Sequence, residues 1–192
     1  MPDSSNGYEK HAEIFMLARN SRIGPRVMRD WARHLAEGAE VLELGCGHGV
    51  ISEVLVEAGL TLFAVDASPA LLAAFRKRFP QVRTECAAAQ DSSFFERRFD
   101  GVVAWGLMFL LEEGAQRRLI ANAAAVLKPG GQLVFTAPRE RIEWIDAITE
   151  RPSRSLGATA YERLLNEAGL MVAPGTTDEG GNYYFYAARE QE

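Results

Sequence analysis

Apolar residues follow two different patterns along the chain. Short runs that are apolar almost throughout are typical of strands buried on both faces of a sheet, and apolar residues that recur every three or four positions are typical of helices. The first pattern predicts strands at 40–44, 61–66, 82–86, 99–105, 132–138 and 182–189. The second predicts helices at 51–59, 68–79, 113–127 and 161–169. Because the two kinds of element alternate, we expect an α/β fold with a doubly wound, mostly parallel sheet and helices on both faces.

Two of these helices carry start signals. Ser68 followed by Pro69 predicts an N-cap and a first helical residue. Thr159 and Glu162 have the spacing of a capping box for the helix that follows them.

The chain before residue 40 predicts helices of its own. Tyr8, Ala12, Phe15 and Arg19 are spaced to share one helix face. Further along, a basic stripe runs beside an apolar one, and its members are Arg22, Arg26, Arg29 and Arg33. We interpret this stripe as a solvated face, while a phosphate-binding surface is the alternative. We therefore expect one domain over 1–192, with a helical lid at 1–36 and a Rossmann-like core at 40–192.

Composition narrows the classes of function. The net charge of -5 disfavours a general nucleic-acid binder. Two cysteines are too few for a disulfide framework, and the first ten residues lack the pattern of a signal peptide, so we expect a cytoplasmic protein. The longest apolar run, 102–111, is too short to cross a membrane. His11, His34 and His48 lack metal-ligand spacing, so no metal site is expected.

The stretch "VLELGCGHGV" at 41–50 is the main candidate for a ligand site. Gly45 and Gly47 match the first two positions of the dinucleotide fingerprint G-x-G-x-x-G, but Val50 occupies the third. In addition, the carboxylate of Glu43 would repel a pyrophosphate held at the helix N-terminus. A cationic ligand without phosphate fits better, and S-adenosyl-L-methionine (SAM), with its ammonium and sulfonium groups, is such a ligand.

These residues resemble motif I of the class I SAM-dependent methyltransferases, and the likeness extends from about Tyr8 through "LKPGG". The resemblance implies a seven-stranded sheet whose last strand is inserted antiparallel, with S-adenosyl-L-homocysteine (SAH) as the product. It implies that Glu43 faces the methionine amine, that Asp66 bonds the ribose hydroxyls and that Arg19 lies near the methionine carboxylate. The full set of implied cofactor contacts is Tyr8, Arg19, Glu43, Gly45, Cys46, Gly47, Asp66, Ala67, Ser68, Ala89, Gln90, Asp91, Ala104 and Trp105.

One segment departs from the family pattern. Many relatives carry an acidic D-A-E-like motif after the third strand, but this chain reads "AAAQDSSF", with Ala88 in place of the first acid. We therefore expect adenine recognition through backbone groups together with Gln90 or Asp91.

Acceptor residues are expected after the fourth strand and in the C-terminal third of the chain. The sequence "AWGL" at 104–107 lacks the [DNS]-P-P-[YFW] motif of nucleobase-amine methylases, which favours another acceptor. The candidates are Trp105, Met108, Phe109, Arg139, Trp144 and Tyr183, with Asp146, Ser155, Tyr161, Glu179 and Asn182 on the same connections. No catalytic set is recognisable among them, so no general base is chosen.

The expected function is methyl transfer from SAM to a small-molecule acceptor. Three alternatives stay open: an RNA- or protein-directed methyltransferase that uses the arginine stripe, a nicotinamide-dependent oxidoreductase, and a SAM-binding protein without catalysis. No membrane partner is expected, and the sequence carries no signal for the oligomeric state.

Overall fold

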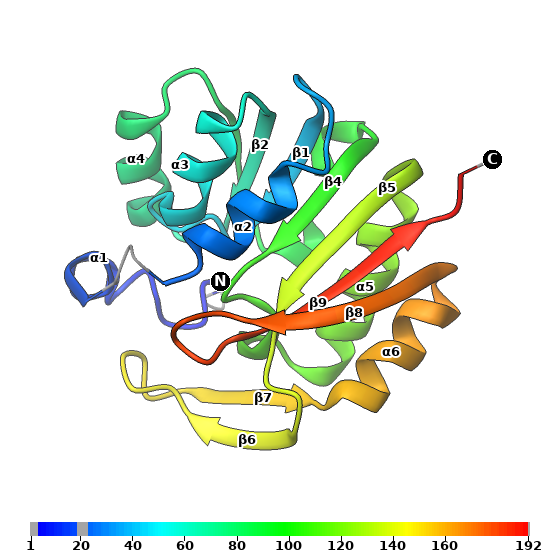
Figure 1. Ribbon diagram of the computed structural model, residues 1–192. Helices are drawn as coiled ribbons and strands as arrows, with labels where there is room; N and C mark the ends of the chain where they lie inside the picture. Colours follow the sequence, from blue (N-terminus) through cyan, green and yellow to red (C-terminus); the bar gives the residue numbers. More distant parts are fainter. Residues whose placement is uncertain (1–3, 19–22, 192) are drawn as a thin grey trace.

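A seven-stranded sheet in the order β3-β2-β1-β4-β5-β9-β8 forms the centre of the molecule (Figure 1). The structure is a computed structural model that describes residues 4–18 and 23–191. Strand β9 pairs antiparallel with both β5 and β8, and the other pairings are parallel. The strands are β1 (Glu40–Leu44), β2 (Thr61–Asp66), β3 (Arg83–Cys86), β4 (Phe99–Ala104), β5 (Leu127–Thr136), β8 (Leu170–Thr177) and β9 (Tyr183–Arg189). The expected mostly parallel sheet, with its last strand inserted antiparallel, is confirmed.

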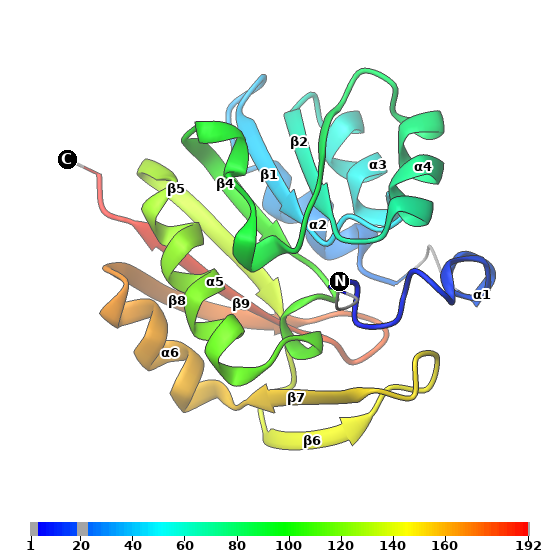
Figure 2. The same cartoon turned by 180° about the vertical axis from the view of Figure 1, so that it is seen from behind.

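Helices cover both faces of this sheet, as the alternating pattern predicted (Figures 1 and 2). One face packs against α2 (Pro25–Ala32), α3 (Val50–Glu57) and α4 (Pro69–Arg78). The other packs against α5 (Glu113–Ala125) and α6 (Ala158–Glu167). Helix α1 (Ala12–Ala18) precedes them in the chain. Among the described residues, three 3-10 turns complete the helical elements: η1 (Ala89–Asp91), η2 (Phe94–Glu96) and η3 (Met108–Leu110).

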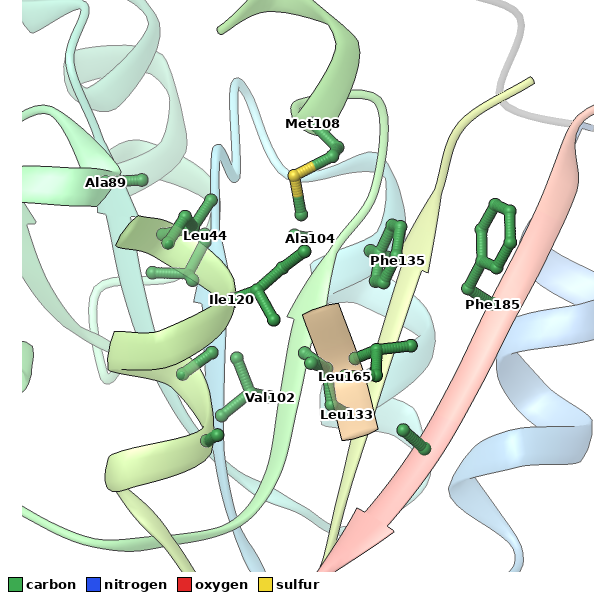
Figure 3. Close-up of a cluster of buried hydrophobic side chains, with 14 of the residues drawn as sticks. Leu44, Ala89, Val102, Ala104, Met108, Ile120, Leu133, Phe135, Leu165 and Phe185 are labelled. Carbon is green, nitrogen blue, oxygen red and sulfur yellow. The ribbon is translucent and has the colours of Figure 1, made fainter. Parts of the chain in front are cut away.

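Residues alternate between two apolar cores along the central strands. Figure 3 shows Leu44, Val102 and Phe135 of the sheet facing the same cluster as Ile120 of α5 and Leu165 of α6. Their strand neighbours Val41, Val103 and Val134 contribute to the cluster on the other face. The strands are therefore apolar on both faces, which explains why they read as nearly continuous apolar runs.

Several elements differ from the sequence-based expectation. Strand β8 and a separate hairpin of β6 (Arg141–Ile145) and β7 (Pro152–Leu156) lie in a region where no strand was predicted. Strand β5 begins at Leu127, before the glycines expected to precede it, because Leu127 pairs with Phe99 ahead of a register shift.

Two local predictions have opposite outcomes. Ser68 caps α4 as predicted, since its hydroxyl oxygen accepts a hydrogen bond from the Leu71 amide. The capping box was wrong, because α6 begins at Ala158 with Gly157 as its N-cap and no side-chain cap. Gly157 has a φ of 85°, and a side chain there would come within 3.0 Å of the Arg141 amide nitrogen. The backbone turn at Gly157 thus starts the helix before Thr159.

Candidate functional site

A cavity of about 330 Å³ lies at the carboxyl ends of β1, β2, β4 and β5. Ligands in doubly wound sheets bind at this edge, where the strand order reverses, here between β1 and β4. Side chains from four strand ends line it: Glu43, Asp66, Trp105 and Thr136. Its other walls come from residues 4–8, from α1, from η3 and from the turn at 146–148 between β6 and β7.

The glycine loop after β1 needs bare backbone for packing as well as for a ligand. Gly45, Gly47 and Gly49 have φ values of 72°, 54° and 92°, which disfavour residues with a side chain. A Cβ on Gly49 would come within 2.4 Å of the Phe79 ring. Arg78 of α4 donates to the carbonyl oxygens of His48 and Gly49 at 2.7 and 3.2 Å. Gly49 is thus the close-packing glycine, one residue earlier than in the dinucleotide fingerprint.

Glu43 is a buried acid at the end of β1 that also lines the cavity. Its side chain is 3% exposed, and the Ser52 hydroxyl of α3 donates to its Oε2 atom at 2.5 Å. Burial raises the pKa of Glu43 to about 8, and the nearby Asp66 adds to this increase, although the Ser52 hydrogen bond opposes it. A cationic group in the cavity would favour the ionised form.

Asp66 ties the glycine loop to the end of β2. Its Oδ2 atom accepts from the Gly47 amide at 2.7 Å, and its Oδ1 atom accepts from the Ser68 amide at 2.8 Å. Burial raises the pKa of Asp66, while these two hydrogen bonds lower it. Each carboxylate oxygen can accept a second hydrogen bond, so Asp66 retains acceptor capacity toward the cavity that it lines.

The other expected cofactor residues divide between the cavity and its surroundings. Residues that line it are Gly45, Cys46, Gly47, Ala67, Ala89, Gln90, Trp105 and Tyr8. Ser68 and Ala104 are buried outside the lining, and Asp91 is exposed. Arg19 lies outside the described residues. Burial raises the pKa of the Cys46 thiol, in agreement with a packing residue rather than a nucleophile.

The segment before α1 covers the cavity, with an architecture that differs from the prediction. Tyr8 lies in turns ahead of α1, not on the helix, but its ring still contacts Phe15 edge to face with centroids 5.0 Å apart. The Tyr8 hydroxyl donates to Asp146 Oδ2 at 3.1 Å. Glu9 accepts from the Ser68 hydroxyl at 2.5 Å and from the Ala70 amide at 3.0 Å, at the N-terminus of α4. Sequence reasoning missed Glu9, since an acid in a polar segment carries no spacing signal.

The acceptor candidates also divide into residues that line the cavity and residues that do not. Trp105, Phe109, Asp146 and Asn182 line the cavity, and Trp144 packs against Phe109 with ring centroids 5.5 Å apart. The others lie outside the described lining: Met108 is buried in the core, Arg139 stacks over the Tyr183 ring, Ser155 donates to Pro138, Tyr161 donates to Gln116, and Glu179 pairs with Arg26.

A buried hydrogen-bonded chain that the sequence did not reveal fixes Trp105. Its indole Nε1 donates to the Tyr184 hydroxyl at 2.7 Å, and that hydroxyl donates to Asp178 Oδ2 at 2.9 Å. Asp178 also accepts from the Gly180 and Asn182 amides in the β8–β9 turn. One aromatic wall of the cavity is thus held by the turn that carries Asn182.

We expect Tyr184→Phe to lower the free energy of unfolding by about 1–3 kcal/mol, because the Trp105 N–H and the Asp178 carboxylate both lose a buried partner. Denaturant unfolding measures this change. Tyr186→Phe on the same strand is the control, and an equal effect of both variants would contradict the role of the chain.

The described arginines of the stripe lie on α2 and at its C-cap, and each pairs with an acidic side chain. Arg26 pairs with Glu179 at 2.5 Å, Arg33 with Asp30 at 2.9 Å and Arg29 with Glu57 at 4.0 Å, while Arg22 lies outside the described residues. Val27, Met28 and Trp31 on the other side of α2 are buried. This arrangement agrees with a solvated face.

The described residues contain neither a candidate membrane-spanning helix nor a candidate metal cluster. No helix in 4–18 or 23–191 is both long and apolar enough to cross a membrane. Within the same ranges, no cluster of three or more His, Cys, Asp or Glu residues could hold a metal ion.

Comparisons with known proteins agree with this geometry. Residues 41–131 match the model of the family described as a methyltransferase domain. This match, over a little less than half of the chain, supports a methyltransferase domain of the class I SAM-dependent type. It is 33% identical over 105 residues to a ubiquinone biosynthesis O-methyltransferase from Coxiella burnetii, covering 52% of this chain and 44% of that protein. It is 32% identical over 123 residues to an uncharacterized methyltransferase from Mycobacterium bovis, covering 63% and 49%. The chain thus spans about half the length of these curated relatives.

Solved structures support the fold. The 1,6-didemethyltoxoflavin-N1-methyltransferase of Burkholderia thailandensis, with bound 1,6-didemethyltoxoflavin and SAH, superposes with a TM-score of 0.75 at 19% identity, over 96% of this chain and 84% of the other. An amino pentose methyltransferase of Micromonospora echinaspora, with bound SAM, gives a TM-score of 0.73 at 19% identity over 94% and 96%.

Proposed function

We propose that this chain binds SAM in the cavity at the carboxyl ends of β1 and β2 and transfers its methyl group to a small-molecule acceptor. The observation that carries the proposal is the pair of carboxylates, Glu43 and Asp66, on either side of a glycine loop with open backbone. The match of residues 41–131 to the methyltransferase family model and the similarity to curated methyltransferases support the same activity.

The chain's own residues suit this cofactor chemically. Glu43 would accept from the methionine ammonium, and Asp66 would accept from the ribose hydroxyls while it keeps its bonds to the loop. Ala89 and Gln90 would face the adenine. When bound, SAM supplies a methyl group that its sulfonium already activates. The protein then needs chiefly to hold an acceptor nucleophile in line with that group and to exclude water.

The competing functions have weaker support. The described arginines of α2 are paired with acids, so the stripe offers little to an RNA backbone. A SAM-binding protein without catalysis would bind SAM and show no turnover with any acceptor. A cytoplasmic location remains a prediction that rests on the two unpaired cysteines.

We expect SAM and SAH to bind, and NAD not to bind, because the buried Glu43 offers a pyrophosphate no positive charge at the start of α3 and Val50 occupies the third glycine position. Isothermal titration calorimetry with all three ligands tests this. Tight NAD binding without a response to SAM would refute the proposed function.

We also propose that the chain is a single domain and that its N-terminal segment through α1 acts as a lid; α2, which the sequence-based prediction included in a lid at 1–36, instead packs on the sheet. Tyr8 hydrogen-bonds to the β6–β7 turn and Glu9 to the start of α4, so two separate elements hold the N-terminal segment in place. In this proposal Arg19 pairs with the methionine carboxylate.

Deletion of residues 1–20 is expected to weaken SAM binding by roughly 10- to 150-fold, the equivalent of a charged hydrogen bond of about 1.5–3 kcal/mol, with a smaller effect on thermal stability without ligand. Arg19→Ala is expected to reproduce part of this loss and to leave adenosine binding nearly unaltered. Equal losses for adenosine and SAM would exclude the carboxylate contact, and SAM binding by the deleted protein at full strength would exclude the lid.

A further inference from the structure

The part of the cavity left for an acceptor combines aromatic walls with one carboxylate. If Glu43, Asp66 and the glycine loop hold SAM, the remaining lining includes Tyr8, Trp105 and Phe109 around Asp146. Among the cavity-lining residues that the structure describes, none is a lysine or an arginine, whereas Glu43, Asp66 and Asp146 are all acids.

Asp146 is held in place as an acceptor. Its Oδ1 atom accepts from the amides of Ile148 and Thr149 at 3.0 and 2.8 Å and from the Thr149 hydroxyl at 3.0 Å. Its Oδ2 atom accepts from the Tyr8 hydroxyl at 3.1 Å, and the residue is half-buried. These four donors fix the orientation of the carboxylate at the cavity wall that it lines.

Neighbouring side chains hold the aromatic walls in place. The Tyr184 hydroxyl accepts a hydrogen bond from the Trp105 indole N–H, and Trp144 packs on Phe109. Fixed rings of this kind stack on planar groups and attract cations through their faces. With Glu43 and Asp66 engaged by SAM, an anionic acceptor would still meet Asp146 and no described basic side chain in the lining, which is unfavourable in a partly enclosed site.

We propose that the methyl acceptor is an aliphatic amine carried on an aromatic or heteroaromatic ring, without a carboxylate or phosphate group, and that its nitrogen binds beside Asp146. This inference rests on the proposed function and names its substrate class. The amine would bind as an ammonium and first lose a proton to water. The neutral nitrogen would then form a bond to the methyl carbon as the carbon–sulfur bond breaks, and the bonding pair would stay on sulfur. The products are a methylated ammonium and neutral SAH, so atoms and charge balance.

The test measures binding to the full chain and needs no turnover. SAH is titrated first, and failure of SAH to bind would count against the proposed function. With SAH-saturated protein, calorimetry then compares three probes that share an indole: tryptamine (cationic), 3-ethylindole (neutral) and indole-3-propionate (anionic). We expect tryptamine to bind at least about tenfold more tightly than indole-3-propionate, with 3-ethylindole between them, since a tenfold ratio needs only about 1.4 kcal/mol.

Two variants separate Asp146 from the general charge of the protein. Asp146→Asn retains the Oδ1 acceptor of the turn, and we expect it to remove most of the preference for tryptamine over 3-ethylindole. Glu143→Gln removes an exposed charge from the same hairpin, outside the described lining, and is expected to leave that preference unchanged. If SAH binds but indole-3-propionate binds as tightly as tryptamine, or if tryptamine does not bind at millimolar concentration, the inference is overturned.

Discussion

Asp66→Ala is expected to weaken SAM binding by roughly 10- to 150-fold, the equivalent of about 1.5–3 kcal/mol for a carboxylate that accepts hydrogen bonds from both ribose hydroxyls. The structure adds a second expected effect. Because the Gly47 and Ser68 amides both donate to this carboxylate, the alanine variant also loses the tie between the glycine loop and β2. We therefore expect a lower free energy of unfolding, by about 1–3 kcal/mol, in the absence of ligand.

The two effects of Asp66 can be measured separately. Calorimetry with SAM gives the affinity, and denaturant unfolding without ligand gives the stability. Asp66→Asn serves as a second variant, because its amide oxygen can still accept from one backbone amide while the charge is lost. Glu37→Ala removes an exposed carboxylate outside the described lining and is expected to leave both quantities nearly unchanged. If Asp66→Ala binds SAM within twofold of the unaltered protein, Asp66 is a structural residue only and the ribose does not bind beside it.

The parts of the fold that the sequence predicted are those whose signals are local. The strands β1, β2 and β4 alternate between two buried faces, and the Ser68–Pro69 start needs only its own turn. The residues of β6 and β8 are largely exposed, and the buried residues of β7 include two serines, Ser153 and Ser155. These strands were not predicted because no apolar period marks them. The start of α6 was placed too late because the φ of Gly157 outweighs the side-chain signals at Thr159 and Glu162.

In the candidate site, too, the residues with a local sequence signal were predicted and the residues without one were not. Motif I and the acid at the end of β2 lie in the order that the resemblance implies, at neighbouring strand ends. Glu9, Tyr184 and Asp178 were missed because each acts through a partner that is distant in the sequence: Ser68 for Glu9, and Trp105 for the Tyr184–Asp178 pair. Tertiary hydrogen bonds of this kind leave no spacing pattern in the chain.

The buried acid Glu43 should make both stability and SAM binding depend on pH. Its pKa of about 8 in the folded protein lies above the ordinary value of 4.5. The folded state therefore retains a proton that the unfolded chain releases, and this contribution to stability is lost as the pH rises from about 4.5 to about 8. Glu43→Gln, which cannot titrate, is expected to show a flatter dependence of the free energy of unfolding on pH over this range.

Binding of SAM should have the opposite dependence on pH. A ligand ammonium favours ionised Glu43, so binding below pH 8 must displace the proton, and the affinity is expected to rise by up to about tenfold per pH unit between about pH 5.5 and 7.5. Calorimetry in buffers of different ionisation enthalpy should detect the release of most of one proton at about pH 7. Glu43→Gln is expected to lose this proton release. The ligand 5′-methylthioadenosine, which lacks the amino-acid end, should bind to the unaltered protein with little dependence on pH. Equal proton release in Glu43→Gln and the unaltered protein would contradict this role of Glu43, because the released proton would then come from another group.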